Sequence, residues 1–151
     1  MKERVNDRSW MPPTKHELIK ALQALKDVAA GNSGLPPSIW RSFILDEDLL
    51  VILLSIMQKC WKDKAVPKSW TTMYFNVLAK AGPGNDLSLL KNYRGIAIAE
   101  VLSKVYTSIL KSRLDTFYES IAPEYCCGFR KGRGRSDSIF AVKQQLRKLK
   151  I

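Results

Sequence analysis

Cysteine and histidine are scarce in this sequence of 151 residues, which has three cysteines and one histidine. The cysteines lack the C-x-x-C spacing of a metal site, and the adjacent Cys126 and Cys127 cannot easily bridge to each other. Because His16 is the one histidine, a zinc site is not expected. This cysteine usage predicts a protein of a reducing intracellular compartment, without distinguishing nucleus from cytoplasm.

Long hydrophobic runs are also missing. The first ten residues, MKERVNDRSW, lack the apolar segment of a signal peptide. The richest apolar run, from Leu49 to Met57, is too short to cross a bilayer and follows three acidic residues. We therefore expect no membrane-spanning segment.

Acidic residues are few: 14 Asp and Glu stand against 25 Lys and Arg, for a net charge of +11. Such an excess predicts a polyanionic partner, with nucleic acid first and an anionic membrane surface second. The charge is concentrated between Gly128 and Ile151, where eight Lys and Arg accompany one acid, Asp137. The alternative is the solvated basic face of an ordinary soluble protein.

The sequence also lacks a recognisable set of catalytic groups. The acids stand singly or at predicted helix starts, and none precedes the strand-like run that would place a metal-binding carboxylate. His16 lies in a predicted helix cap, and the sequence contains neither a catalytic triad nor a P-loop. We therefore predict no catalytic residue, no metal ligand and no cofactor for this chain, only binding groups.

The patterns that are present indicate a helix-dominated α+β fold. Thr14 and Glu17 form a capping box that begins an amphipathic helix predicted to reach Ala30. Further helices are expected at about 38–44, 46–62, 100–118 and from Asp137 onward, with a β-hairpin at about 71–98 and Trp70 as a core anchor. Residues 1–13 are expected to be a flexible leader and residues 14–151 one domain.

Two cations flank the predicted hairpin, since Lys80 ends its first strand and Arg94 begins its second. An ammonium and a forked guanidinium on a stiff support are the groups that hold a triphosphate, so both are candidate nucleotide-binding residues. The alternative is that the two side chains simply end their strands in water.

Glycines and cations alternate between Gly128 and Arg135. The glycines permit positive φ and close approach of the backbone to a phosphate. The candidate nucleic-acid contacts are Gly128, Phe129, Arg130, Lys131, Gly132, Arg133 and Arg135. The N–H groups at the following helix start are candidate phosphate donors, unless the Asp137 carboxylate caps that helix itself. For Phe129 the choice is between stacking on a base and packing against the next helix, and packing is the expectation.

Taken in order, segments from about Pro12 to Leu149 resemble the N-terminal portion of a reverse transcriptase from a non-long-terminal-repeat (LINE-type) retrotransposon. The most specific blocks are NYRGI at 92–96 and GFRKGRG at 128–134. Cys60-Trp61 followed by VPKSW at 66–70, and the helical segment from Val101 to Leu114, resemble family segments in the same order.

This resemblance implies the fingers and palm-entry part of a right-hand polymerase fold, whose complete enzyme performs RNA-directed DNA synthesis with Mg²⁺. Lys80 and Arg94 would hold the triphosphate of the incoming deoxynucleotide, and the Gly128 block would lie beside the RNA template and DNA primer. The family's catalytic aspartates lie on palm strands beyond the last predicted helix. The resemblance therefore predicts a fragment that is inactive alone.

The sequence also departs from the family pattern. Cys126-Cys127 and Arg135 stand where the family commonly has Gln and Thr, and the segment 31–36 differs as well. A rival interpretation is a non-catalytic basic module that binds RNA or DNA. In either case the apolar stripe of Ile139, Val142, Leu146 and Leu149 predicts self-association through the last helix.

Overall fold

The computed structural model describes residues 10–82, 86–128 and 130–149, so most of the predicted leader and Phe129 lie outside the described residues. Contacts divide the chain into two compact units, one of which is Trp10–Ile109, while the other contains the chain from Leu110 onward. Each unit is described by itself.

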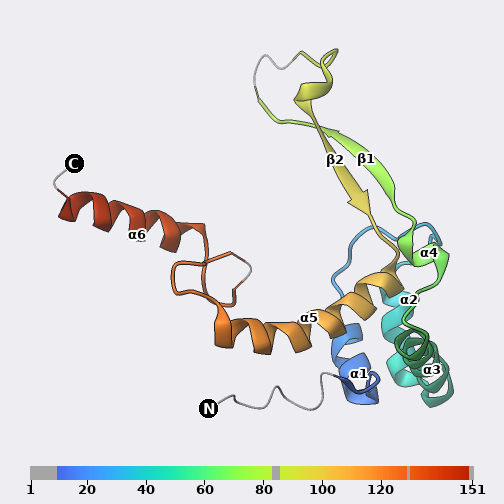
Figure 1. Ribbon diagram of the computed structural model, residues 1–151. Helices are drawn as coiled ribbons and strands as arrows, with labels where there is room; N and C mark the ends of the chain where they lie inside the picture. The colour runs from blue at the N-terminus through green and yellow to red at the C-terminus, as the bar shows by residue number, and fades with distance from the viewer. Residues whose placement is uncertain (1–9, 83–85, 129, 150–151) are drawn as a thin grey trace. The chain divides into compact units, whose positions relative to one another are not determined.

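The fold is α+β and dominated by helices, as the sequence predicts (Figure 1). In chain order the elements are α1 (Lys15–Gln23), α2 (Pro37–Ser42), the 3₁₀ turn η2 (Phe43–Leu45), α3 (Glu47–Asp63), α4 (Lys68–Thr71), β1 (Tyr74–Ala79), the 3₁₀ turn η3 (Leu90–Asn92), β2 (Tyr93–Ile98), α5 (Val101–Ile121) and α6 (Arg135–Lys148).

Local signals set the starts of α1 and α3. The predicted capping box is confirmed: Glu17 N–H donates to Thr14 Oγ1 at 3.3 Å, and Thr14 N–H donates to Glu17 Oε2 at 2.9 Å. At α3 the Asp46 carboxylate accepts two backbone N–H groups, from Asp48 and Leu49. Both caps satisfy donors that a helix cannot satisfy internally.

The prediction that the first helix reaches Ala30 is wrong, because α1 ends at Gln23. The guanidinium of Arg41, in α2, donates from Nη1 to the carbonyl of Leu25 at 3.0 Å and from Nη2 to Asp27 at 2.5 Å. A continued helix would use that carbonyl for its own ladder. The tertiary contact therefore competes with the helical pattern and holds the segment in an irregular conformation.

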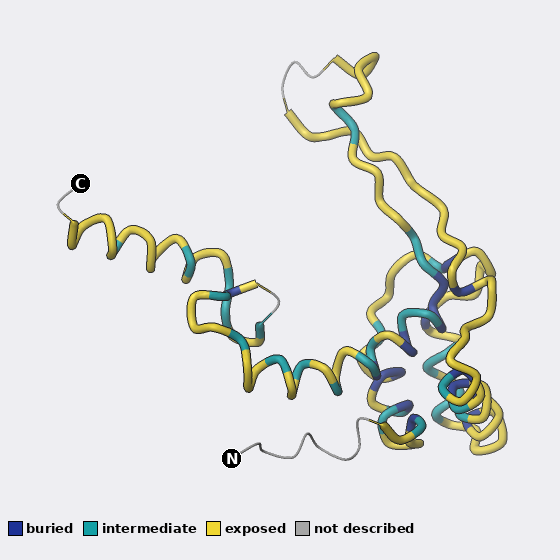
Figure 2. Tube along the Cα trace, viewed as in Figure 1, coloured by how far each residue is buried: buried dark blue, intermediate teal, exposed yellow. Residues whose placement is uncertain are grey.

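The core of the Trp10–Ile109 unit is made by one face of each of three helices and by Trp70 (Figure 2). Leu18 and Leu22 of α1 are fully buried, and so, to within 2%, are Leu50, Leu53 and Met57 of α3 and Val101 and Val105 of α5. Trp70 is 5% exposed, and the centroid of its ring lies 5.9 Å from that of the Tyr106 ring. The predicted role of Trp70 as a core anchor is confirmed. Apolar burial of this kind is the main stabilising contribution to the unit.

The two strands form an antiparallel hairpin that projects from the helices of the same unit (Figure 1). Its register pairs Tyr74 with Ile98 and Ala79 with Tyr93, inside the predicted range of 71–98. Every residue of β1 is exposed, including Phe75 at 71% and Val77 at 59%. The hairpin thus carries apolar side chains that no described part of the chain covers.

In the second unit a loop follows the C-terminal half of α5 and leads into α6. This last helix begins at Arg135, two residues before the predicted start at Asp137. Gly134 occupies the cap position, and its N–H donates to Asp137 Oδ2 at 2.7 Å. None of the described α6 side chains is buried, so the predicted apolar stripe is exposed.

Candidate nucleotide and nucleic-acid contacts

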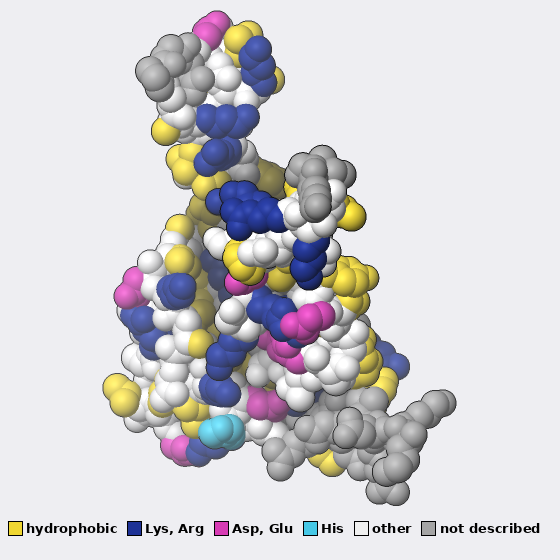
Figure 3. All heavy atoms as spheres, turned by 90° about the vertical axis from the view of Figure 1, so that its left-hand side faces the viewer, with side chains coloured by type: hydrophobic (Ala, Val, Ile, Leu, Met, Phe, Trp, Pro, Cys, Tyr) yellow, Lys and Arg dark blue, Asp and Glu magenta, His cyan; other side chains and the backbone are white. Residues whose placement is uncertain are grey.

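The hairpin places Lys80 and Arg94 on one face at its loop end. Arg94 lies opposite Leu78 in the register, and the Lys80 N–H continues the ladder by donating to the Asn92 carbonyl at 2.7 Å. Because side chains alternate along a strand, Lys80 shares the face of Leu78 and therefore of Arg94. Figure 3 shows dark-blue Lys and Arg side chains on the projecting hairpin, at the top of the view.

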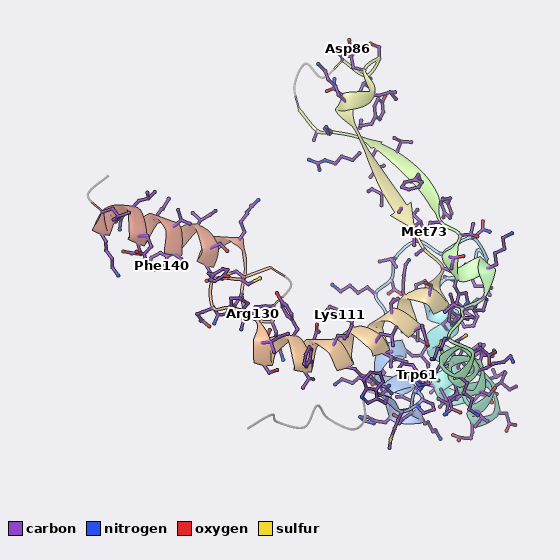
Figure 4. The ribbon with its side chains drawn as sticks, viewed as in Figure 1. Trp61, Met73, Asp86, Lys111, Arg130 and Phe140 are labelled. Carbon is purple, nitrogen blue, oxygen red and sulfur yellow. The ribbon has the colours of Figure 1, made fainter. Side chains whose placement is uncertain are left out.

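Hydrogen bonds connect the residues between positions 86 and 92, which lead into β2. Asp86, labelled in Figure 4, accepts the N–H and hydroxyl of Ser88 at 2.9 and 2.6 Å, and these bonds lower the pKa of its carboxyl. The Asn92 side chain donates to the Asp86 carbonyl, and the Lys80 ammonium donates to the Lys91 carbonyl. Lys80 and Arg94 thus lie near the same end of the hairpin, as the sequence pattern predicts, and their role as nucleotide contacts stays a prediction.

Two of the predicted cations in the loop between α5 and α6 form ion pairs with carboxylates of the same unit. The guanidinium of Arg130 donates to Glu119, and that of Arg133 donates to Glu124. These bonds from the guanidinium groups lower the pKa of both carboxyls, so Glu119 and Glu124 stay ionised. Sequence reasoning counted all the loop cations as candidate contacts and could not identify which ones carboxylates already bind.

Lys131 and Arg135 differ from those two cations. Both are exposed, and neither makes an ion pair with another described residue. Gly132 has φ of +73°, the left-handed conformation that favours glycine, whereas Gly128 and Gly134 do not adopt it among the described residues. The sharp turn at Gly132 therefore follows Lys131 directly.

At the helix start that was a candidate phosphate site, the Asp137 N–H donates to the Gly134 carbonyl at 3.1 Å. Asp137 accepts the Gly134 N–H, so the carboxylate caps α6 as the alternative interpretation held. A phosphate at this helix start would lie close to that carboxylate, and the two negative charges would repel each other. We therefore leave the α6 N-terminus out of the candidate contacts.

A hollow of about 520 Å³ lies beside the loop, within the second unit. Its lining consists of Lys111, Asp115, Thr116, Glu119, Arg130 and Lys131. Figure 4 labels Lys111 on α5 and Arg130 in the loop. Both acids of the hollow have a cationic partner: Lys111 Nζ lies 2.5 Å from Asp115, and Arg130 Nη2 lies 2.9 Å from Glu119.

Glu100 is a buried carboxylate that the sequence did not indicate. It is 4% exposed and accepts three hydrogen bonds, from Ser33 N–H at 3.0 Å, Ser33 Oγ at 2.7 Å and Val101 N–H at 3.1 Å. Burial raises the pKa of Glu100, but the bonds from Ser33 and Val101 outweigh burial and hold it below its ordinary value. A single acid just before a helix gives no sign that its partner lies in a loop far away in the chain, so no sequence signal identified it.

Three further findings concern metal binding, membrane spans and similarity to known proteins. Among residues 10–82, 86–128 and 130–149, no cluster of three or more His, Cys, Asp and Glu side chains is arranged to hold a metal ion. In the same described ranges, no helix has both the length and the apolarity that a membrane span requires. A scan against protein-family models and a search of curated proteins found no match to this chain.

Proposed function

We propose that this chain forms the template- and nucleotide-binding part of an RNA-directed DNA polymerase of the non-long-terminal-repeat type, and that it has no polymerase activity alone. The observation that carries the proposal is the placement of Lys80 and Arg94 on one face at the loop end of a hairpin. The order of the sequence blocks that resemble the family supports it independently. Mg²⁺ belongs to the complete enzyme.

The chemistry of the hairpin suits a triphosphate. A compact ammonium and a forked guanidinium offer several charge-assisted hydrogen bonds to phosphate oxygens. The Lys80 ammonium donates to the carbonyl of Lys91, a neutral acceptor, whereas a phosphate oxygen would add an opposite charge to such a bond.

Equilibrium titration with a fluorescent deoxynucleoside triphosphate tests the nucleotide site. Lys80→Gln and Arg94→Gln should each weaken binding by about tenfold or more, because each removes a charge-assisted bond of roughly 1.5–3 kcal/mol. Lys20→Gln is the matched control, since it removes one exposed lysine from α1. Equal affinities for all three variants would contradict the nucleotide site.

Primer extension on an RNA template with Mg²⁺ tests the second part of the proposal. We expect no incorporation above background by the purified chain, with a known reverse transcriptase as the positive control. Robust incorporation by the chain alone would refute the claim of inactivity.

A second candidate function is a non-catalytic RNA- or DNA-binding module. The exposed cations of the second unit favour it: Lys131, Arg135, Lys143, Arg147 and Lys148. Salt-dependent binding of nucleic acid without any triphosphate binding at the hairpin would favour this module over the polymerase part.

A further inference from the structure

The buried face of α3 is only part of the apolar surface of this helix. Leu53 and Met57 face the core of their unit, whereas Leu49, Ile52 and Ile56 are 39%, 56% and 39% exposed. A spacing of three and then four residues places Leu49, Ile52 and Ile56 together on one side of the helix, and we call these residues the α3 stripe. Two turns of water-exposed Leu and Ile form a seam of the kind that packs against another helix.

The last helix, α6, carries an apolar stripe with a matching spacing. The α6 stripe consists of Ile139, Val142, Leu146 and Leu149, which are separated by three, four and three positions and are all exposed. When two helices pack antiparallel, the spacing along one seam is met in reverse by the spacing along the other. The last three residues of the α6 stripe then meet the α3 stripe in reverse order, with Leu146 opposite Ile52.

The two helices carry opposite net charge. α6 contains four cations and one acid, for a net charge of +3, whereas α3 with its cap residue Asp46 contains four acids and two cations, for a net charge of −2. Two copies of α6 therefore repel each other, as do two copies of α3, while α6 and α3 attract. The charges favour a contact between the two different stripes over a contact between identical ones.

The charges at the helix ends give the direction of this contact. At the start of α3, Glu47 forms an ion pair with a lysine of α1, but Asp48 has no cationic partner among the described residues. At the end of α6, Arg147 and Lys148 have no carboxylate partner in the described part of the chain. An antiparallel arrangement brings these two ends together, whereas a parallel one would place the α6 cations toward the end of α3 that carries Lys62.

We propose that α6 of one copy of this chain docks antiparallel on the α3 stripe of a second copy. The α3 stripe is thereby the surface that receives the exposed last helix, and the contact involves neither Lys80 nor Arg94. Each copy offers both stripes, so the contact is heterologous. Because each stripe exposes only a few apolar side chains, the interface is small, and the association is weak and reversible.

Disulfide trapping between two separately purified variants tests the pairing. One chain carries Ile52→Cys and the other Leu146→Cys, both in a Cys126→Ser background, because Cys126 is the cysteine that is not buried. After mixing and oxidation with diamide, the mixed disulfide dimer should exceed each homodimer in intact-mass spectrometry. In the matched control Val51→Cys replaces Ile52→Cys, since Val51 is 50% exposed but lies about 100° around the helix from Ile52. The control should yield about tenfold less mixed dimer, because its sulfur points away from the docked helix.

Three results of this experiment would overturn the proposal. A Leu146→Cys homodimer in excess of the mixed dimer would show that α6 pairs with α6. Equal yields from Val51→Cys and Ile52→Cys would show random collision instead of a docked helix, and the absence of a mixed dimer would show no contact. The substituted helix positions are exposed, so circular dichroism should give the wild-type helix signal for every variant.

Light scattering measures the same contact without cross-linking. At about 0.15 M KCl, repulsion between the cationic chains is screened beyond about 8 Å. Ile52→Lys should cancel the rise of mass with concentration, because it places an ammonium in the α3 stripe. Val51→Lys adds the same charge to the same helix and should keep the wild-type rise. Equal behaviour of the two variants, or a wild-type chain that stays monomeric, would contradict the docking of α6 on α3.

Removing one acid from either end of α3 tests the direction of the contact. Asp48→Asn should raise the dissociation constant of self-association by about two- to fivefold, because it removes the acid nearest the cationic end of the docked α6. Asp63→Asn is the matched control at the other end of α3, where Asp63 pairs with Lys59 at 3.1 Å, and it should have little effect. Equal effects, or a larger effect of Asp63→Asn, would overturn the antiparallel direction.

Discussion

Replacing Glu100 by glutamine should test the buried carboxylate more sharply than any other change in the chain. The glutamine amide would keep one acceptor oxygen in place of the Glu100 oxygen that binds Ser33 Oγ and the Val101 N–H. Its amide nitrogen would replace the other oxygen, which accepts the Ser33 N–H at 3.0 Å. Two donors would then face each other at a position that is 4% exposed.

The expected loss is one charge-assisted hydrogen bond together with a buried N–H that has no acceptor, about 2–3 kcal/mol in the free energy of unfolding. For a chain of this size the loss corresponds to a fall in Tm of roughly 4–12 °C. Asp63→Asn is the matched control, because it removes an exposed carboxylate of an i,i+4 pair with Lys59, a pair that contributes about 0.3–0.5 kcal/mol.

The loss of stability caused by Glu100→Gln should depend on pH, and the shifted pKa of Glu100 gives the direction. The folded-state pKa of Glu100 lies below its ordinary value of 4.5, so its stabilising contribution is complete above that pH and is lost as the pH falls through the folded-state pKa. The difference in Tm between the wild type and Glu100→Gln should therefore be full at about pH 7 and shrink below pH 4.5. Thermal unfolding followed by circular dichroism measures it. An unchanged Tm near neutral pH, or a difference that stays constant down to about pH 3, would refute the reasoning.

Two further predictions concern packing and association. Gly31→Ala should destabilise the chain by about 1–3 kcal/mol in a urea titration, because a Cβ there would lie 2.5 Å from the backbone Cα of Glu100; an unchanged midpoint would contradict that close approach. Self-association through the exposed stripe of α6 should make the mass from light scattering rise with concentration, and Leu146→Lys, at a residue 44% exposed, should reduce the rise; a monomer at every concentration would contradict it.

Local signals account for most of what the sequence predicted. The structure confirms the Thr14 capping box and the hairpin. Both could be predicted because their signals, a capping pair and alternating β-formers, lie within short segments of the sequence. The prediction of a longer first helix was wrong for the opposite reason. The Arg41 guanidinium, which belongs to another helix, donates to the Leu25 carbonyl, and hydrophobic periodicity contains no information about such a contact. Charge pairing has the same limit. Composition identified a cationic loop, but the capture of Arg130 by Glu119 is visible only in three dimensions.

The exposed hairpin has a thermodynamic consequence for any ligand that covers it. A two-stranded hairpin has marginal stability by itself, and Phe75, Val77 and Ile96 leave 71%, 59% and 45% of their surfaces in water. A partner that buries these side chains binds with a negative change in heat capacity, whereas one that contacts only Lys80 and Arg94 does not. Calorimetry at several temperatures therefore distinguishes a ligand that merely touches the charged end of the hairpin from one that lies along its length.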